Sequence, residues 1–147
     1  MSNRMFRGKR TEYGEWVYGY LIGDDVIVGN IVEFTDEYFN TSFWWRVKPE
    51  TVSQYAELKD AQNEREIYGY DIITFTIFDP VSGGDTQYTG VVMFSDGQWQ
   101  IWNSATDPYW GSDGPFNLHA VWYNDDTIEV IGNTFDNAYL LNAANAV

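Results

Sequence analysis

The side chains that could carry out catalysis are few in this sequence and lie far apart along it. The chain has one histidine, His119, and no cysteine among its 147 residues. A cysteine nucleophile and a paired-histidine metal site are therefore excluded. The Gly-x-Ser-x-Gly element of many serine nucleophiles is absent as well. We interpret His119, in the alternating stretch 118–122, as a structural or surface residue of a strand.

Carboxylates are plentiful but stand where turns are expected. The pairs Asp24-Asp25 and Asp125-Asp126 follow apolar runs, and aspartate is favoured in turns because its side chain bonds to the local backbone. The loop from Asp107 to Asp113 offers oxygen ligands, yet it lacks the EF-hand spacing and its closing glutamate. We therefore predict no catalytic residue, no metal site and no cofactor, and a protein that is not an enzyme.

Aromatic side chains are the one residue class that is unusually abundant, at 18% of the chain. Adjacent residues of a strand point to opposite faces, so Trp44 and Trp45 cannot both join one core. Trp and Tyr are enriched where proteins bury surface against other proteins. We predict an interaction surface that includes Trp44, Trp45, Trp99, Trp102, Tyr109 and Trp110. Stacking on a glycan or small molecule is an alternative use of the same rings.

The net charge of −14 is spread unevenly. Four of the eight Lys and Arg residues lie within the first ten positions, and none follows Arg65. Direct nucleic-acid binding is disfavoured, because cations provide most of the affinity for phosphate backbones. An acidic mimic of nucleic acid is an alternative function. No apolar run approaches the ~20 residues of a membrane span and no leader pattern opens the chain, so we expect a cytoplasmic protein without membrane contact.

The element pattern is mainly β. In the first 60 residues we expect a hairpin of Trp16–Ile22 and Val26–Val28, extended by Ile31–Phe34, with a further strand over Phe43–Val47. Pro49–Asp60 reads as a short helical turn or an ordered connector. We expect residues 1–60 to form an N-terminal β region and residues 61–147 a second region, the two together making either two domains or one compact unit.

The second region shows five strand-like segments and a long loop, which predicts a small barrel. A short C-terminal helix is expected over Asn137–Ala146. The Asp96-Gly97 turn between two apolar runs indicates a hairpin. The five segments are Ile72–Phe78, Tyr88–Phe94, Gln98–Trp102, Leu118–Tyr123 and Thr127–Ile131.

Four segments in this order resemble the YopX-like proteins of bacteriophages and prophages: Phe6–Arg10, Gly14–Ile22, Val47–Val52 and Glu129–Asn133. The resemblance implies an SH3-like barrel in the C-terminal part and a phage-encoded protein in a bacterial host cell, but no established activity. Glycines of the family pattern are replaced at Ser53, Glu57 and Tyr70. These replacements remove glycine where a positive φ could be required.

Taken together, these patterns favour a non-enzymatic protein-interaction or self-assembling module. We expect a homo-oligomer, with a host or phage protein as the other partner to consider. The acidic mimic that blocks a host DNA-binding protein and the glycan or small-molecule binder stay open as alternatives.

Overall fold

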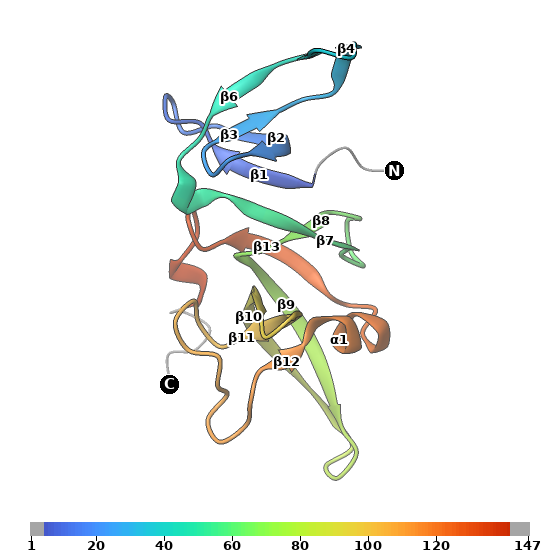
Figure 1. The fold of residues 1–147 in the computed structure, drawn as a ribbon. Helices are drawn as coiled ribbons and strands as arrows, with labels where there is room; N and C mark the ends of the chain where they lie inside the picture. The colour runs from blue at the N-terminus through green and yellow to red at the C-terminus, as the bar shows by residue number, and fades with distance from the viewer. Residues whose placement is uncertain (1–4, 142–147) are drawn as a thin grey trace. The chain divides into compact units, whose positions relative to one another are not determined.

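The computed structural model describes residues 5–141, and its fold is mainly β, as the sequence predicts (Figure 1). Contacts divide the chain into an N-terminal unit that ends at Tyr55 and a C-terminal unit that begins at Ala56. The predicted boundary lay after residue 60. No helix within residues 5–141 is long and apolar enough to cross a membrane.

The N-terminal unit is an antiparallel sheet in the order β6-β3-β2-β1-β7, to which β7 contributes its first residues, up to Tyr55. A bridge between Arg10 and Val47 curls the sheet by joining the end of β1 to the residue after β6. Val47 and Ile27 are fully buried inside this curl, and Gly8 gives them room, since a Cβ there would lie 3.0 Å from Val47 Cβ. The strands are β1 (Phe6–Lys9), β2 (Trp16–Ile22), β3 (Val26–Val28), β6 (Trp44–Arg46) and β7 (Ser53–Lys59).

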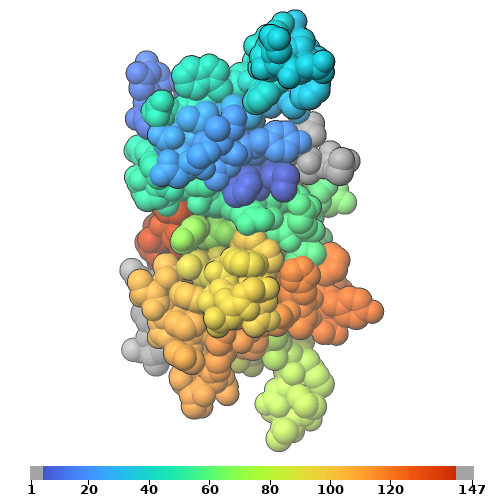
Figure 2. Space-filling model, viewed as in Figure 1, coloured from blue at the N-terminus to red at the C-terminus, as the bar shows by residue number. Residues whose placement is uncertain are grey.

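A separate two-stranded sheet, β4 (Ile31–Phe34) with β5 (Phe39–Thr41), continues from β3 and β6. The Gly29 N–H donates to the Phe43 carbonyl at 2.9 Å and the Ser42 N–H to the Asn30 carbonyl at 2.8 Å. We call residues 31–41 the arm. It projects beyond the sheet of its own unit (Figures 1 and 2). The sequence predicted that Ile31–Phe34 would extend the main sheet, and the structure instead pairs it only with β5.

The segment Pro49–Asp60 is more ordered than a connector. Its first part forms the 3-10 turn η1 (Pro49–Thr51), as one of the two alternatives predicted, and Ser53–Lys59 then forms β7. The Thr51 hydroxyl donates to the Lys48 carbonyl at 2.7 Å and accepts from the Lys9 N–H at 2.8 Å. This hydroxyl links the turn to β1 and so places the following residues, β7, where they pair with β1. Such a tertiary contact is not visible in local strand propensity.

The C-terminal unit contains a curled five-stranded sheet in the order β12-β11-β10-β9-β13. The predicted hairpin between β10 and β11 is confirmed, with Asp96 and Gly97 both at positive φ in its turn. The strands of this unit after β7 are β8 (Glu66–Tyr68), β9 (Asp71–Asp79), β10 (Gly84–Ser95), β11 (Gln98–Trp102), β12 (Phe116–Asn117) and β13 (Glu129–Asn133).

The strand predicted over Leu118–Tyr123 is wrong, because this segment forms helix α1 (Leu118–Asn124). The Asn117 side chain caps the helix by accepting from the Ala120 N–H at 2.9 Å. Leu118 and Val121, three residues apart, are its buried positions, and they join the core of β9, β10, β11 and β13. Of the predicted terminal helix, residues 139–141 are helical, and residues 142–146 lie outside the described residues.

Two of the positions where glycine is replaced do require a positive φ. Glu57 has φ +63° and Tyr70 has φ +69°, and this region costs a non-glycine residue roughly 1–2 kcal/mol. Ser53 is not among the residues with positive φ. Tyr70 gains from its side chain, whose ring lies 5.3 Å from that of Phe135. Glu57 is exposed, so its strain has no packing to offset it.

We therefore expect Glu57→Gly to raise the free energy of unfolding by about 0.5–1 kcal/mol, because glycine relieves the left-handed backbone strain. Urea unfolding of the purified variant measures this change. Gln54→Gly is the matched control, since Gln54 is exposed in the same strand without positive φ. It is expected to lower the free energy of unfolding by about 0.5–1 kcal/mol. Equal effects of the two substitutions would contradict the strain argument.

Candidate interaction surface

The histidine and the aspartates that the sequence offered as candidates for catalysis or metal binding are either exposed or hydrogen-bonded to nearby groups of the protein. His119 is exposed on α1. Asp125 Oδ2 accepts from the Thr76 N–H at 2.8 Å, and its Oδ1 accepts from the N–H of Thr127 at 2.8 Å and from the Thr127 hydroxyl at 2.6 Å. Asp107 Oδ1 accepts from the Tyr109 N–H at 3.0 Å. Residues 5–141 contain no group of three or more His, Cys, Asp or Glu side chains arranged to hold a metal ion.

The structure distributes the six predicted aromatic residues over both units. Trp110 is half-buried against the core of the C-terminal unit, edge-on to Phe75 with the ring centroids 6.1 Å apart. The indole N–H of Trp102 donates to Gln100 Oε1 at 2.8 Å. Trp99 is half-buried against the same core and packs on Phe94. Tyr109 is exposed. The six residues thus do not form one surface within the C-terminal unit.

Trp44 and Trp45 belong to the N-terminal unit and differ in what covers them. The guanidinium of Arg10 lies 3.6 Å from the centroid of the Trp45 ring, a cation–π contact that shields this ring from water. Trp45 is 38% exposed and Trp44 is 62% exposed. Trp44 therefore carries the more accessible ring of the pair.

Trp44 is part of an apolar stripe on the outside of the sheet. The register aligns Trp44 with Val28 and Tyr20, and Arg46 with Val26 and Ile22. Directly opposed residues, and residues two apart along a strand, share one face. We call this side of β2, β3 and β6 the outer face. It presents Tyr20, Ile22 and Trp44 to solvent, whereas Val28, between Tyr20 and Trp44, is buried.

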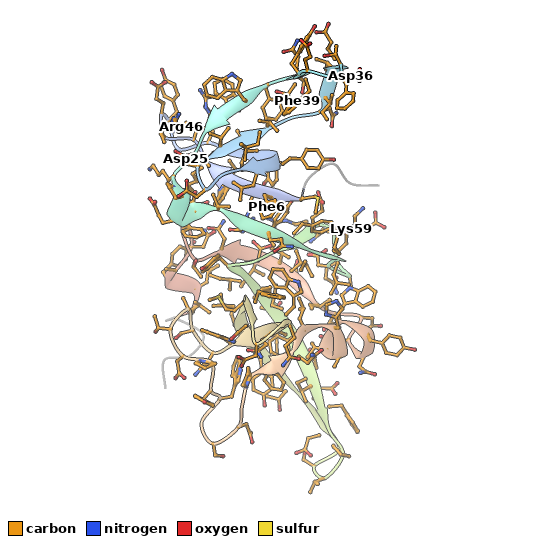
Figure 3. The ribbon with its side chains drawn as sticks, in the orientation of Figure 1. Phe6, Asp25, Asp36, Phe39, Arg46 and Lys59 are labelled. Atoms are coloured by element: carbon orange, nitrogen blue, oxygen red, sulfur yellow. The ribbon has the colours of Figure 1, made fainter. Side chains whose placement is uncertain are left out.

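A cation stands at the end of the outer face. Arg46 Nη1 donates to Asp25 Oδ2 at 2.6 Å, and the Arg46 side chain is still 59% exposed (Figure 3). A single surface ion pair of this kind contributes little to stability. Only Nη1 is bonded to Asp25, and a guanidinium carries further N–H donors from which a carboxylate of a partner can accept.

The arm carries exposed apolar side chains that were not among the predicted site residues. Every residue from Asn30 to Asn40 is exposed. Phe34 and Phe39 stand opposite each other in the register, and the exposed fractions of the apolar side chains run from 49% to 75%. These side chains are Ile31, Val32, Phe34, Tyr38 and Phe39.

Polar contacts order the arm although its apolar side chains lie in water. The Thr35 hydroxyl accepts from the N–H groups of Glu37 and Tyr38, both at 3.2 Å. Asn40 Nδ2 donates to Glu33 Oε1 at 3.1 Å. A hydrogen bond from the Tyr38 hydroxyl to Glu33 raises the pKa of Tyr38. The arm is therefore held in a defined shape before any partner covers it.

Sequence reasoning missed the arm because it treated Ile31–Phe34 as one more strand of a sheet. A signal was present in the residues. The stretch 31–39 has apolar side chains at consecutive positions on both sides of an acidic turn formed by Asp36 and Glu37, which is not the alternation of a strand with one buried face.

Comparison with known proteins gives a family and a fold. The profile of the family described as YopX protein matches residues 5–142. Among solved structures, the chain is similar to protein EF1440 from Enterococcus faecalis, with a TM-score of 0.56 and 20% sequence identity over 93% of this chain and 96% of that chain. At this identity the likeness is one of fold. No curated protein matches the chain.

The Tyr38–Glu33 contact makes the arm sensitive to alkaline pH. Because the pKa of Tyr38 is raised in the folded protein, its contribution to stability is complete below the ordinary tyrosine pKa and disappears as pH rises through the raised value. We expect Glu33→Gln to lower the pKa of Tyr38, measured by NMR titration of ring-labelled tyrosine.

Glu37→Gln is the matched control, since it removes the same charge from the neighbouring turn. It is expected to move the pKa of Tyr38 less than Glu33→Gln does. Equal shifts from the two substitutions would show that the hydrogen bond is not the cause.

Proposed function

The chain belongs to the YopX protein family, and from that premise we propose that it is a non-enzymatic protein-interaction module of a phage or prophage, at work in the cytoplasm of the bacterial host. The module acts by presenting apolar side chains to another protein. The arm is the single observation that carries this proposal.

The hydrophobic effect favours a covered arm. Burying one large apolar side chain is worth about 1.5–3 kcal/mol, and the arm leaves five of them exposed. An isolated two-stranded hairpin is marginally stable in water, whereas a strand pair that is covered by another protein gains this apolar burial. Contiguous exposed apolar surface of this kind marks interaction sites.

The chemistry of the arm supports a protein partner over the other classes. Glu33, Asp36 and Glu37 give the arm three acidic residues and no Lys or Arg, so phosphate backbones are repelled. The arm is also a projecting hairpin (Figure 2), while ligand sites for small molecules and sugars are concave. A partner with an apolar surface and few acidic groups fits it best.

The proposal predicts that the arm is needed for protein capture. Full-length protein with an affinity tag is expressed in phage-infected or lysogenic cells, crosslinked and purified, and the bound proteins, including untagged copies of the chain itself, are quantified by mass spectrometry. Phe34→Ser with Phe39→Ser is expected to lower the captured protein at least about tenfold, the effect of losing ~1.4 kcal/mol of binding free energy.

The control changes an exposed apolar pair elsewhere. Phe78 and Val81 lie exposed at the β9–β10 turn of the C-terminal unit, so Phe78→Ser with Val81→Ser removes similar surface without touching the arm. Its captured proteins are expected to match those of the unchanged chain. The proposal is overturned if the control variant loses capture while the arm variant keeps it. It is also overturned if the unchanged chain captures no specific protein.

A further inference from the structure

We propose that the arm of one copy docks on the outer face of β2, β3 and β6 of a second copy of this chain. The inference rests on the proposed function and names its partner and its receiving surface. It follows from the charge of each part of the chain, from the chemistry of the outer face and from the geometry of the arm's root.

Charge selects the N-terminal unit as the receiving surface. The C-terminal unit, from Ala56 onward, has two Lys or Arg and fourteen Asp or Glu residues in the sequence. The N-terminal unit outside the arm has six Lys or Arg against five Asp or Glu. The acidic arm is therefore repelled by the C-terminal unit of another copy and tolerated by its N-terminal unit, and like charges across an interface suppress the wrong contact.

The outer face matches the arm in chemistry. It offers exposed apolar and aromatic side chains at Tyr20, Ile22 and Trp44, with the exposed guanidinium of Arg46 beside them. The arm offers two phenylalanines together with the carboxylates of Asp36 and Glu37. Figure 3 shows Phe39 and Asp36 on the arm and Arg46 at the base of the same hairpin. An apolar centre bordered by opposite charges is the usual layout of a protein interface.

The root of the arm prevents it from covering the outer face of its own copy. The arm leaves from β3 and β6, which are themselves strands of that face, and backbone hydrogen bonds pair Gly29 with Phe43 and Ser42 with Asn30. The Phe43 ring also fills the place where a Cβ of Gly29 would stand. Folding the arm back would require a sharp reversal of both strands at Gly29, where Ser42 and the Phe43 ring are already in close contact, so in this proposal a second copy supplies the cover.

Each copy therefore carries one arm and one receiving face. A contact between two different surfaces closes either as a dimer that exchanges arms or as a ring. In both cases every arm and every outer face is covered, and no acidic C-terminal unit is needed in the contact.

Analytical ultracentrifugation of the full-length protein from about 1 to 100 µM tests the inference, with two variants that each remove one side of the contact. The arm variant is Phe34→Ser with Phe39→Ser, and the face variant is Ile22→Ser with Trp44→Ser. The unchanged chain is expected to form an oligomer of defined size. Each variant alone is expected to weaken self-association at least about 30-fold, since a side chain central to an interface contributes ~2 kcal/mol or more.

Mixing the two variants is the decisive measurement. The arm variant retains an intact face and the face variant an intact arm, so the mixture is expected to form a one-to-one mixed pair, held by a single contact, that neither variant forms alone. Circular dichroism spectra matching the unchanged chain establish that both variants are folded. Phe78→Ser with Val81→Ser is expected to leave self-association unchanged.

The inference is overturned if the folded variants do not associate when mixed, and three further results would also overturn it. The unchanged chain could remain a monomer throughout, the oligomer could survive in the arm variant, or the arm variant alone could lose it while the face variant keeps it, as arm-to-arm pairing requires. If the monomer result were accompanied by arm-dependent capture of a different protein, the proposed function would stand and only the second-copy partner would fall.

Discussion

The hairpin from Val26 to Arg46 has an inner half that is partly buried and an outer half that is exposed. The bend between the two halves, at Gly29 and Phe43, determines which residues of the N-terminal unit are left in water. Below the bend, Ile27 is fully buried inside the curled sheet. Above it, every residue from Asn30 to Asn40 is exposed. The close approach of the Phe43 ring to Gly29 fixes the direction in which the outer half leaves. A side chain at position 29 would displace that ring, so the arm depends on a glycine.

The arm shows how a protein can keep an apolar hairpin ordered without burying it. Its backbone ladder and the contacts of Thr35, Asn40 and Glu33 supply order, while its apolar side chains stay available. Ordering before binding lowers the entropy cost of association. The acidic residues of the arm discourage indiscriminate pairing of exposed strands, a device that edge strands commonly use.

Buried carboxylates in the C-terminal unit illustrate the opposite use of acidic residues. Asp60 is 3% exposed, and its carboxylate accepts from the backbone N–H groups of Asn63, Arg65 and Val130 at 2.9 to 3.0 Å. Asp125 binds the backbone of Thr76 and Thr127 in the same way. These groups connect loops to strands, because a buried N–H without a partner is costly. A sequence rich in aspartate thus holds both structural and surface carboxylates.

Much of the fold could be predicted because local patterns and tertiary packing agree. The mainly β class, the hairpin of β2 and β3, and the Asp96-Gly97 turn follow from β-branched residues and from turn chemistry. The segment Leu118–Tyr123 could not be predicted in the same way. Its apolar residues fit a period of two or of three to four, and the Asn117 cap and the core beneath Leu118 and Val121 selected the helix.

The sequence by itself determined the charge of each part, the absence of cysteine and the membership of a family. It also marked Glu57 and Tyr70 as places where glycine is usual, and the backbone there does take a positive φ. Only the tertiary structure decided the surroundings of each aromatic ring: Trp110 packs against the core of its unit and Trp45 is contacted by Arg10, while the arm stays exposed. The physical reason is that exposure depends on what neighbours a residue across strands, and such neighbours are set by register and bending that no single stretch of sequence encodes.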